Sequence, residues 1–291
     1  MLRPREILRR NPLVAGVARR LRAHLRWAGA GAAARERHGF FGDFASWEEA
    51  ARLSSGYDTD VILERVRDSL LKVKNGEAVF ERDSVIFDRI QYSWPVLASL
   101  LWIASRHGNR LSLLDFGGSL GSCYYQNRGF LSHLQRFRWS IVEQHHFVEV
   151  GKRDFEDDHL RFYHDVRSCV LAEEPQVVFF SSSLQYLEKP FAVLEEIFSY
   201  GVQYILFDLT GFVSGPKHRI VFQSVPPSIY PASYPVWFFN EHLFLEYFRG
   251  TYELLADFKG YVGESLVIDD YVPAGYKGFL FRRRGAKDSL G

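Results

Sequence analysis

The sequence Leu111-Ser-Leu-Leu-Asp-Phe-Gly-Gly-Ser-Leu-Gly-Ser122 joins an apolar run, which ends in Asp115, to a glycine-rich turn. Residues 123–134 can continue from this turn as a helix. A strand, a tight turn and a helix N-terminus within about two dozen residues are typical of the place where an open α/β sheet binds a nucleotide-like cofactor. The stretch therefore predicts an α/β fold with a cofactor site at this turn.

The spacing of the glycines indicates which cofactor the turn suits. The dinucleotide fingerprint requires G-x-G-x-x-G, but aligned on Gly117 this turn has Ser119 and Ser122 at the later glycine positions. A P-loop is excluded because no Gly-Lys-Ser/Thr follows. What is left is Asp-x-Gly-Gly-x-x-Gly over residues 115–121, where glycines allow a ligand to approach the backbone closely. The alternative is an ordinary turn in which the glycines serve only the shape of the chain.

The composition places limits on the class of protein. With 291 residues, of which 47% are hydrophobic, the chain can form one large domain with an N-terminal extension, or two small domains. Cys123 and Cys169 offer neither a disulfide framework nor zinc-site spacing, which fits a reducing, cytoplasmic location. The chain contains no apolar run of about 18 residues and no signal-peptide pattern, so we expect neither a membrane-spanning helix nor a cleaved leader.

The net charge of +1 conceals a basic N-terminus. Residues 1–37 contain ten arginines and two glutamates, so they carry +8 and the rest of the chain about −7. Behind Asn11-Pro12, a good start for a helix, apolar residues recur at helical spacing between Leu13 and Leu25. Such a basic amphipathic helix can lie on an anionic membrane surface or bind a partner. The alternatives are a helix packed on its own domain and a poorly ordered tail.

Helical and strand patterns alternate through the rest of the chain. Helices are predicted over 47–53, 58–74, 84–106, 122–135, 147–154, 190–200 and 241–249, with Pro95 kinking or dividing the third. Strands are predicted over 111–116, 139–142, 160–163, 177–180, 204–207, 252–258 and 278–283. This alternation predicts a mostly parallel sheet with right-handed crossovers. We expect three regions: a basic helix and linker (1–37), a helical N-terminal cap (38–108) and a cofactor-binding domain (109–291).

The glycine turn and the order of elements resemble class I S-adenosylmethionine-dependent methyltransferases. Their motif I is D/E-x-G-x-G-x-G, and Ser119 stands here in place of the middle glycine. The resemblance covers roughly residues 84–284 and implies a Rossmann-like α/β fold. Its sheet would have seven strands, mostly parallel, with an antiparallel last strand, and N-terminal helices would be added to it.

A closer resemblance links the chain to a family assigned as methyltransferases and often encoded among bacterial surface-polysaccharide genes. The matching segments cover nearly everything except the basic N-terminus. They are Gly39–Gly42 with Trp47, and residues 56–58, 81–84, 92–95, 113–121, 142–144, 183–187 and 223–237. The resemblance does not specify the acceptor.

The methyltransferase resemblance implies S-adenosylmethionine as cofactor and assigns residues to its parts. The methionine portion would lie on the turn formed by Asp115, Gly117, Gly118, Ser119 and Gly121. Glu143, with Gln144 beside it, would bind the ribose hydroxyls at the end of the second strand. Asp165 would lie near the adenine, and Ser181 and Ser182 would leave room for the sulfonium. The alternative for Glu143 is a surface glutamate, and Glu149 would bind the ribose if the second strand is longer. The alternative for Asp165 is a salt-bridged turn.

An alcohol or amine acceptor needs a base close to the transferred methyl group. The candidates are Asp208, which closes the fifth strand, His218 in the irregular stretch after it, and His145. For each histidine alone, a structural role is the alternative. We expect no metal, because the sequence contains no Cys/His/Asp cluster with the spacing of a metal site.

Residues 224–239 contain four prolines and five aromatic side chains. Prolines lower the entropy lost when a loop becomes ordered, and aromatic faces suit sugar rings. Tyr230, Tyr234 and Trp237 are therefore predicted to shape the acceptor pocket. The alternative is a rigid structural loop packed on the N-terminal helices.

These observations favour O-methylation of a glycan, a lipid-linked sugar or a related small acceptor in surface-polysaccharide synthesis. The enzyme would be cytoplasmic and would contact the inner face of the membrane through residues 1–27. Two alternatives are a methyltransferase of a soluble metabolite or nucleotide sugar, and a binding or scaffold protein that keeps the fold without catalysis. Nucleic-acid binding is disfavoured because the chain beyond residue 37 is acidic.

Overall fold

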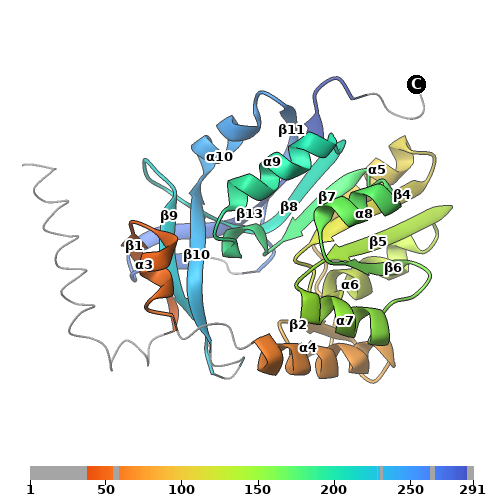
Figure 1. The fold of residues 1–291 in the computed structure, drawn as a ribbon, viewed down its shortest axis with the longest axis horizontal. Helices are drawn as coiled ribbons and strands as arrows, with labels where there is room; N and C mark the ends of the chain where they lie inside the picture. Colours follow the sequence, from red (N-terminus) through yellow and green to blue (C-terminus); the bar gives the residue numbers. More distant parts are fainter. Residues whose placement is uncertain (1–37, 55–58, 228, 230–231, 263–265, 287–291) are drawn as a thin grey trace, which may run out of the picture.

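The computed structural model describes residues 38–54, 59–227, 229, 232–262 and 266–286. The predicted basic helix of residues 1–37 lies outside this part of the chain. In the described residues a mixed sheet of eleven strands forms the centre of the molecule, flanked by helices (Figure 1). The sequence predicted seven strands, and the extra ones come from segments read as loops or helix.

Five parallel strands form the part of the sheet that carries the glycine turn. Their order is β6-β5-β4-β7-β8. Their bounds are β4 (Arg110–Phe116), β5 (Arg136–Val142), β6 (Leu160–Tyr163), β7 (Val177–Ser181) and β8 (Tyr204–Val213). The long strand β13 (Val272–Arg283) pairs antiparallel with β8, and β11 (Tyr252–Lys259) pairs antiparallel with β13.

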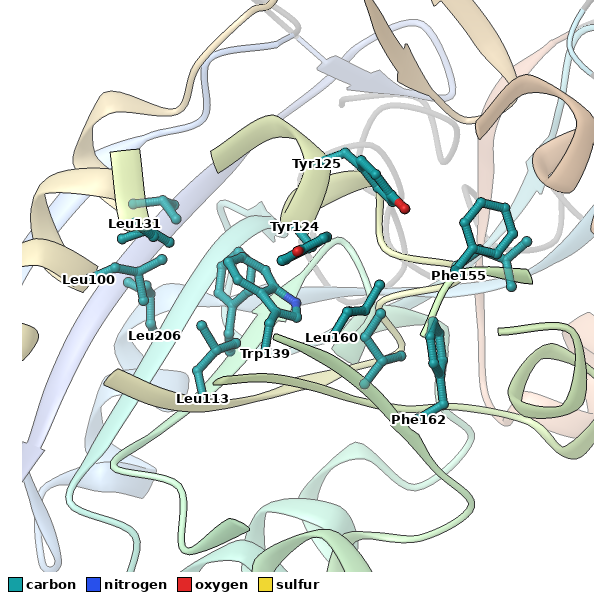
Figure 2. Packing of buried hydrophobic residues seen from close by; sticks show 14 of the residues in the cluster. Leu100, Leu113, Tyr124, Tyr125, Leu131, Trp139, Phe155, Leu160, Phe162 and Leu206 are labelled. Carbon is teal, nitrogen blue, oxygen red and sulfur yellow. The ribbon is translucent and has the colours of Figure 1, made fainter. Parts of the chain in front are cut away.

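Side chains alternate between the two faces of these strands, and each face packs against its own helices. Leu113 and Phe179 belong to one buried cluster, whereas their neighbours Leu114 and Phe180 belong to another. The first cluster includes residues of α4 (Thr59–Lys74), α5 (Trp94–Arg106), α6 (Ser122–Leu131) and α7 (His145–Asp154). The second includes residues of α8 (Val166–Glu173), α9 (Pro190–Tyr200) and α10 (Glu241–Phe248). Figure 2 shows Trp139 among Leu113, Tyr124 and Leu160 in the first cluster.

Beyond the end of β7, strands β8 and β13 continue into a second group of strands. Its members are β1 (Gly39–Phe44), β9 (Arg219–Ser224), β10 (Ser233–Asn240) and β12 (Leu266–Ile268). β10 pairs with β8 and β9, β9 with β1, β1 with β12, and β12 with β13. Because β13 also pairs with β8, the described strands close a six-strand ring, β8-β10-β9-β1-β12-β13. β1, β9 and β10 lie at the left of Figure 1, well away from β5 and β6.

The segment 84–106 is not one helix as predicted. Val85–Phe87 form β3, which pairs with β2 (Phe80–Arg82) in a short hairpin. Helix α5 begins only at Trp94, with Pro95 in its first turn, where the missing N–H costs nothing. The region predicted as a helical cap thus contains α3 (Trp47–Ala51) and α4 together with strands β1, β2 and β3. No helix among the described residues is both long and apolar enough to cross a membrane.

Gly278 of β13 provides a test of the tight packing between β13 and its neighbours. A Cβ at Gly278 would overlap the Phe258 ring and would lie 2.6 Å from the Phe207 carbonyl oxygen, which is backbone and cannot move away. We expect Gly278→Ala to lower the free energy of unfolding by about 2 kcal/mol. Gly275→Ala in the same strand, with no atom within 4 Å of the added Cβ, is the control. Equal urea-unfolding curves for the two variants would contradict this packing.

Candidate functional site

A cavity of about 930 Å³ lies at the carboxyl ends of β4, β5 and β7. In an open α/β sheet this edge is where ligands bind. Of the residues predicted to bind a cofactor, nine line the cavity: Asp115, Gly117, Gly118, Ser119, Glu143, Gln144, Asp165, Ser181 and Ser182. Gly121 lies just beyond it as the N-cap of α6, with φ +109°. The fold therefore gathers residues that are up to 67 positions apart in the sequence.

The glycine turn passes directly over Asp115 and against the segment after β7. A Cβ on Gly118 would lie 2.5 Å from Oδ2 of Asp115, and one on Gly117 would lie 2.7 Å from Cβ of Ser183. Gly117 also has φ +70°, a conformation that favours glycine. Ser119 has φ +54°, which costs a residue with a side chain about 1 kcal/mol. This cost explains why a glycine suits that position in motif I.

Asp115 is buried beneath the turn. Its Oδ2 accepts a hydrogen bond of 2.9 Å from Nε1 of Trp139, and its Oδ1 has no hydrogen-bond partner among the described residues. Burial raises the pKa of Asp115 to about 7, and the charge of Glu143 adds to this effect while the Trp139 bond opposes it. A buried carboxylate with a free oxygen suits a cationic or N–H-bearing ligand.

Two further acids border the same end of the cavity. The carboxylate of Glu143 accepts hydrogen bonds from the backbone N–H groups of Gln144, at 2.5 Å, and Ser119. Burial nevertheless raises its pKa. Asp165 is the N-cap of α8 and accepts bonds from the N–H and hydroxyl of Ser168, which lower its pKa. Glu143 is thus tied to the glycine turn, and Asp165 fixes the start of a helix.

Three residues predicted to act as bases or to bind acceptor lie outside the cavity lining. Asp208 is buried beside Ser181 of β7; burial raises its pKa to about 7, although hydrogen bonds from Leu209 and Ser93 oppose the rise. Nδ1 of His218 accepts a bond of 2.9 Å from the N–H of Asn240, and burial lowers its pKa. Nε1 of Trp237 donates a bond of 3.0 Å to the Leu187 carbonyl.

The remaining predicted residues separate into three cases. Tyr234 lines the cavity. His145 is exposed and stacks on His164, with ring centroids 4.8 Å apart. Tyr230 lies outside the described residues. The segment predicted as a proline-rich loop supplies β10, whose strand pairing with β9 runs through Pro235 opposite Phe222.

The β2–β3 hairpin adds two acids that sequence reasoning did not select. Glu81 is 1% exposed and accepts bonds from the Ser122 hydroxyl, at 2.5 Å, and the Ser84 N–H, at 2.7 Å. Burial raises its pKa to about 7 against these bonds. Asp83, at the hairpin tip with φ +52°, is exposed and also lines the cavity. Burial, and secondarily the charge of Asp83, raises the pKa of Tyr276, which also lines the cavity, to about 12.

The cavity is acidic as a whole. Its described lining contains Glu81, Asp83, Asp115, Glu143, Asp165 and Glu196, whereas Arg82 is the only lysine or arginine among these residues. A site that binds phosphate groups gathers positive side chains or a row of backbone N–H donors. The charge of this cavity therefore favours a cationic or neutral ligand over a polyphosphate.

Comparison with known proteins gives structural neighbours and no sequence relatives. No family model matches the chain, and no curated protein matches it. One neighbour is an S-adenosylmethionine-dependent methyltransferase from Clostridium acetobutylicum, which is 10% identical to this chain with a TM-score of 0.41. The match covers 65% of this chain and 90% of the neighbour. The N-terminal domain of EvdMO1, solved in the presence of SAH and D-fucose, is 14% identical with a TM-score of 0.45. The match covers 78% of this chain and 98% of that domain. The glycopeptide N-methyltransferase MtfA, complexed with sinefungin, is 9% identical, with TM-score 0.41 over 64% and 93%. Because these TM-scores lie below 0.5, function has to be argued from the residues of the cavity itself.

Replacing Asp115 with asparagine is expected to reduce the pH dependence of stability. The folded-state pKa of about 7 exceeds the ordinary value of about 3.9 in an unfolded chain, so the unfolded state releases this proton first. The wild type therefore loses stability as the pH rises from about 4 to about 7, and Asp115→Asn loses less, by about 4 kcal/mol. Urea unfolding below and above this range measures the difference, with the exposed site Asp88→Asn as control. Equal pH dependence in wild type and Asp115→Asn would show that Asp115 titrates normally.

Proposed function

We propose that the protein is an S-adenosylmethionine-dependent methyltransferase. The proposal rests on one observation: the glycine turn, Asp115, Glu143 and Ser181 line the same cavity. The acidic lining agrees with a cofactor that carries positive charge on its ammonium and sulfonium groups. Its single arginine, Arg82, speaks against a dinucleotide or a nucleoside triphosphate.

The residues of the cavity suit the parts of this cofactor. Gly117 and Gly118 would allow the methionine portion to approach the backbone, and Asp115, buried beneath the turn, would hold the turn in this shape. Glu143 would bind the ribose hydroxyls, with Gln144 beside it and Asp165 nearer the adenine. Ser181 and Ser182 would leave space around the sulfur. When bound, the cofactor supplies a methyl group already activated by positive sulfur.

We propose O-methylation of a glycan, a lipid-linked sugar or a related small acceptor as the reaction. The hairpin and the tyrosines Tyr234, Tyr261 and Tyr276, which all line the cavity, offer flat faces for a sugar ring. Because the lining contains so little positive charge, the phosphates of a lipid-linked sugar would stay outside while the sugar enters. A nucleotide sugar held entirely within the cavity is disfavoured for the same reason.

Asp83 is the residue that we propose as the base. Its carboxylate receives no hydrogen bond from the described residues, unlike that of Glu81, which is held by Ser122 and Ser84. Its exposed position in the cavity lining leaves the carboxylate free to contact an acceptor hydroxyl, as a general base must. It would take the proton from the acceptor hydroxyl as the oxygen attacks the methyl group.

The sequence supports an additional role for residues 1–27 at the inner face of the membrane. This proposal depends on the charge of +8 over residues 1–37 and on the helical apolar spacing. Flotation of the full chain and of a chain lacking residues 1–27 with anionic vesicles tests it. Equal flotation of both would exclude anchoring by this segment.

Substitution at Gly118 tests the cofactor site. A Cβ there would push into the Asp115 carboxyl, so we expect Gly118→Ala to weaken binding of S-adenosylhomocysteine by about tenfold or more in calorimetry. Gly129→Ala in α6, with nothing within 4 Å of the added Cβ, should bind like the wild type. A folded wild-type protein that binds neither S-adenosylmethionine nor S-adenosylhomocysteine would exclude the methyltransferase.

Substitution at Asp83 tests the base. Asp83→Asn should lower methyl transfer by about 100-fold, while affinity for S-adenosylhomocysteine stays unchanged because the cofactor residues are untouched. The rate is measured as transfer of tritiated methyl groups from S-adenosylmethionine into membrane and polysaccharide fractions of the source cells. Asp88→Asn, just after the same hairpin and exposed, is the control. Full transfer by Asp83→Asn would remove Asp83 from the mechanism.

A further inference from the structure

Three side chains of metal-ligand type converge at the rim of the cavity. They are His145 and Glu149 on α7 and His164 directly after β6. One potential ligand atom from each lies within 4.8 Å of the other two. Nε2 of His164 is 3.4 Å from Oε1 of Glu149, and the rings of His145 and His164 stack with centroids 4.8 Å apart.

The fold explains why residues so far apart in the sequence meet. β5 and β6 are parallel neighbours, so α7, which starts soon after β5, and the turn after β6 share one edge of the sheet. His145 and Glu149 are four residues apart, which places them on one face of α7. His164 faces this pair from the next strand end.

The chemistry of the three groups matches a zinc-type ion. Imidazole nitrogen and carboxylate oxygen bind zinc at about 2.0–2.2 Å in a tetrahedral arrangement, so neighbouring ligand atoms lie about 3.4 Å apart. The Glu149–His164 pair already has this separation, 3.4 Å. His145 is exposed and can reach the same point by rotating its side chain. Helical ligands at i and i+4 are also the arrangement of zinc-binding helices.

We propose that His145, Glu149 and His164 form a binding site for a divalent transition-metal ion of the zinc class. The fourth ligand position would remain open to water or to a bound molecule. His164 itself lines the cavity, and so do Gln144 beside His145 and Asp165 beside His164. The ion would therefore link α7 to the turn after β6, the two segments that border the Glu143 end of the cavity.

Calorimetric titration of Zn²⁺ into the metal-free full-length protein tests the site. We expect one tight site in the wild type and in His242→Ala, an exposed histidine on α10. His145→Ala, Glu149→Gln and His164→Ala should each bind about tenfold more weakly or worse. All three positions are exposed, and circular dichroism melts of the metal-free variants confirm that each is folded. Co²⁺ provides a second readout, because four-coordinate cobalt absorbs visible light strongly.

Several results would overturn the proposal. Unchanged Zn²⁺ affinity in His164→Ala would place the ion on other histidines. Absence of a one-to-one site in the wild type would leave Glu149 and His164 as a simple ion pair with His145 stacked on it. A weak Co²⁺ spectrum, typical of six-coordinate cobalt, would exclude the tetrahedral site. None of these results depends on binding of S-adenosylhomocysteine, so the metal site and the methyltransferase can fail separately.

Discussion

The burial of the Asp115 carboxyl beneath Gly118 is the constraint on which the rest of the site depends. The carboxyl is held from below by the Trp139 indole at 2.9 Å, and Trp139 is fully buried in the core between sheet and helices (Figure 2). From above, only a glycine leaves room for it, because a Cβ at residue 118 would lie 2.5 Å from its oxygen. The buried Trp139 thus fixes the position of the Asp115 carboxyl, and this carboxyl restricts the path of the glycine turn.

The six-strand ring supplies the opposite wall. β8 is ten residues long and buried throughout, so it extends past β7 and carries the sheet into the ring. Gln223 of β9 and Tyr234 of β10 line the cavity from there, and Oη of Tyr186 donates a bond of 3.0 Å to Oε1 of Gln223. The segment after β7 is thereby tied to the ring. A ligand in the cavity would touch parallel sheet on one side and ring on the other.

Local patterns predicted the elements that are continuous and regular. The strand Leu160–Tyr163 and the helix Pro190–Tyr200 have the predicted bounds. The helix predicted over 241–249 is α10, and Oδ1 of its N-cap Asn240 accepts a bond of 2.8 Å from the N–H of Leu243. The β2–β3 hairpin was missed because the apolar residues of β3 continue the helical spacing of α5. The ring was missed because strand pairing between residue 40 and residue 268 leaves no local trace. Residues predicted from strand ends, such as Asp115 and Glu143, do lie together at one cavity, and their role as cofactor ligands stays a prediction. Local patterns did not select Glu81 and Asp83, which enter through that hairpin. They also did not bring together the His145–Glu149–His164 cluster, because His164 follows a different strand from the helix that carries the other two.

The distribution of charge relates the cavity to the rest of the chain. Two acids of the cavity, Asp115 and Glu81, have pKa values raised to about 7, because each is buried. Such groups weaken the fold as they ionise, and a cationic ligand would offset this cost by supplying the missing positive charge. The arginines of the chain are concentrated instead in residues 1–37.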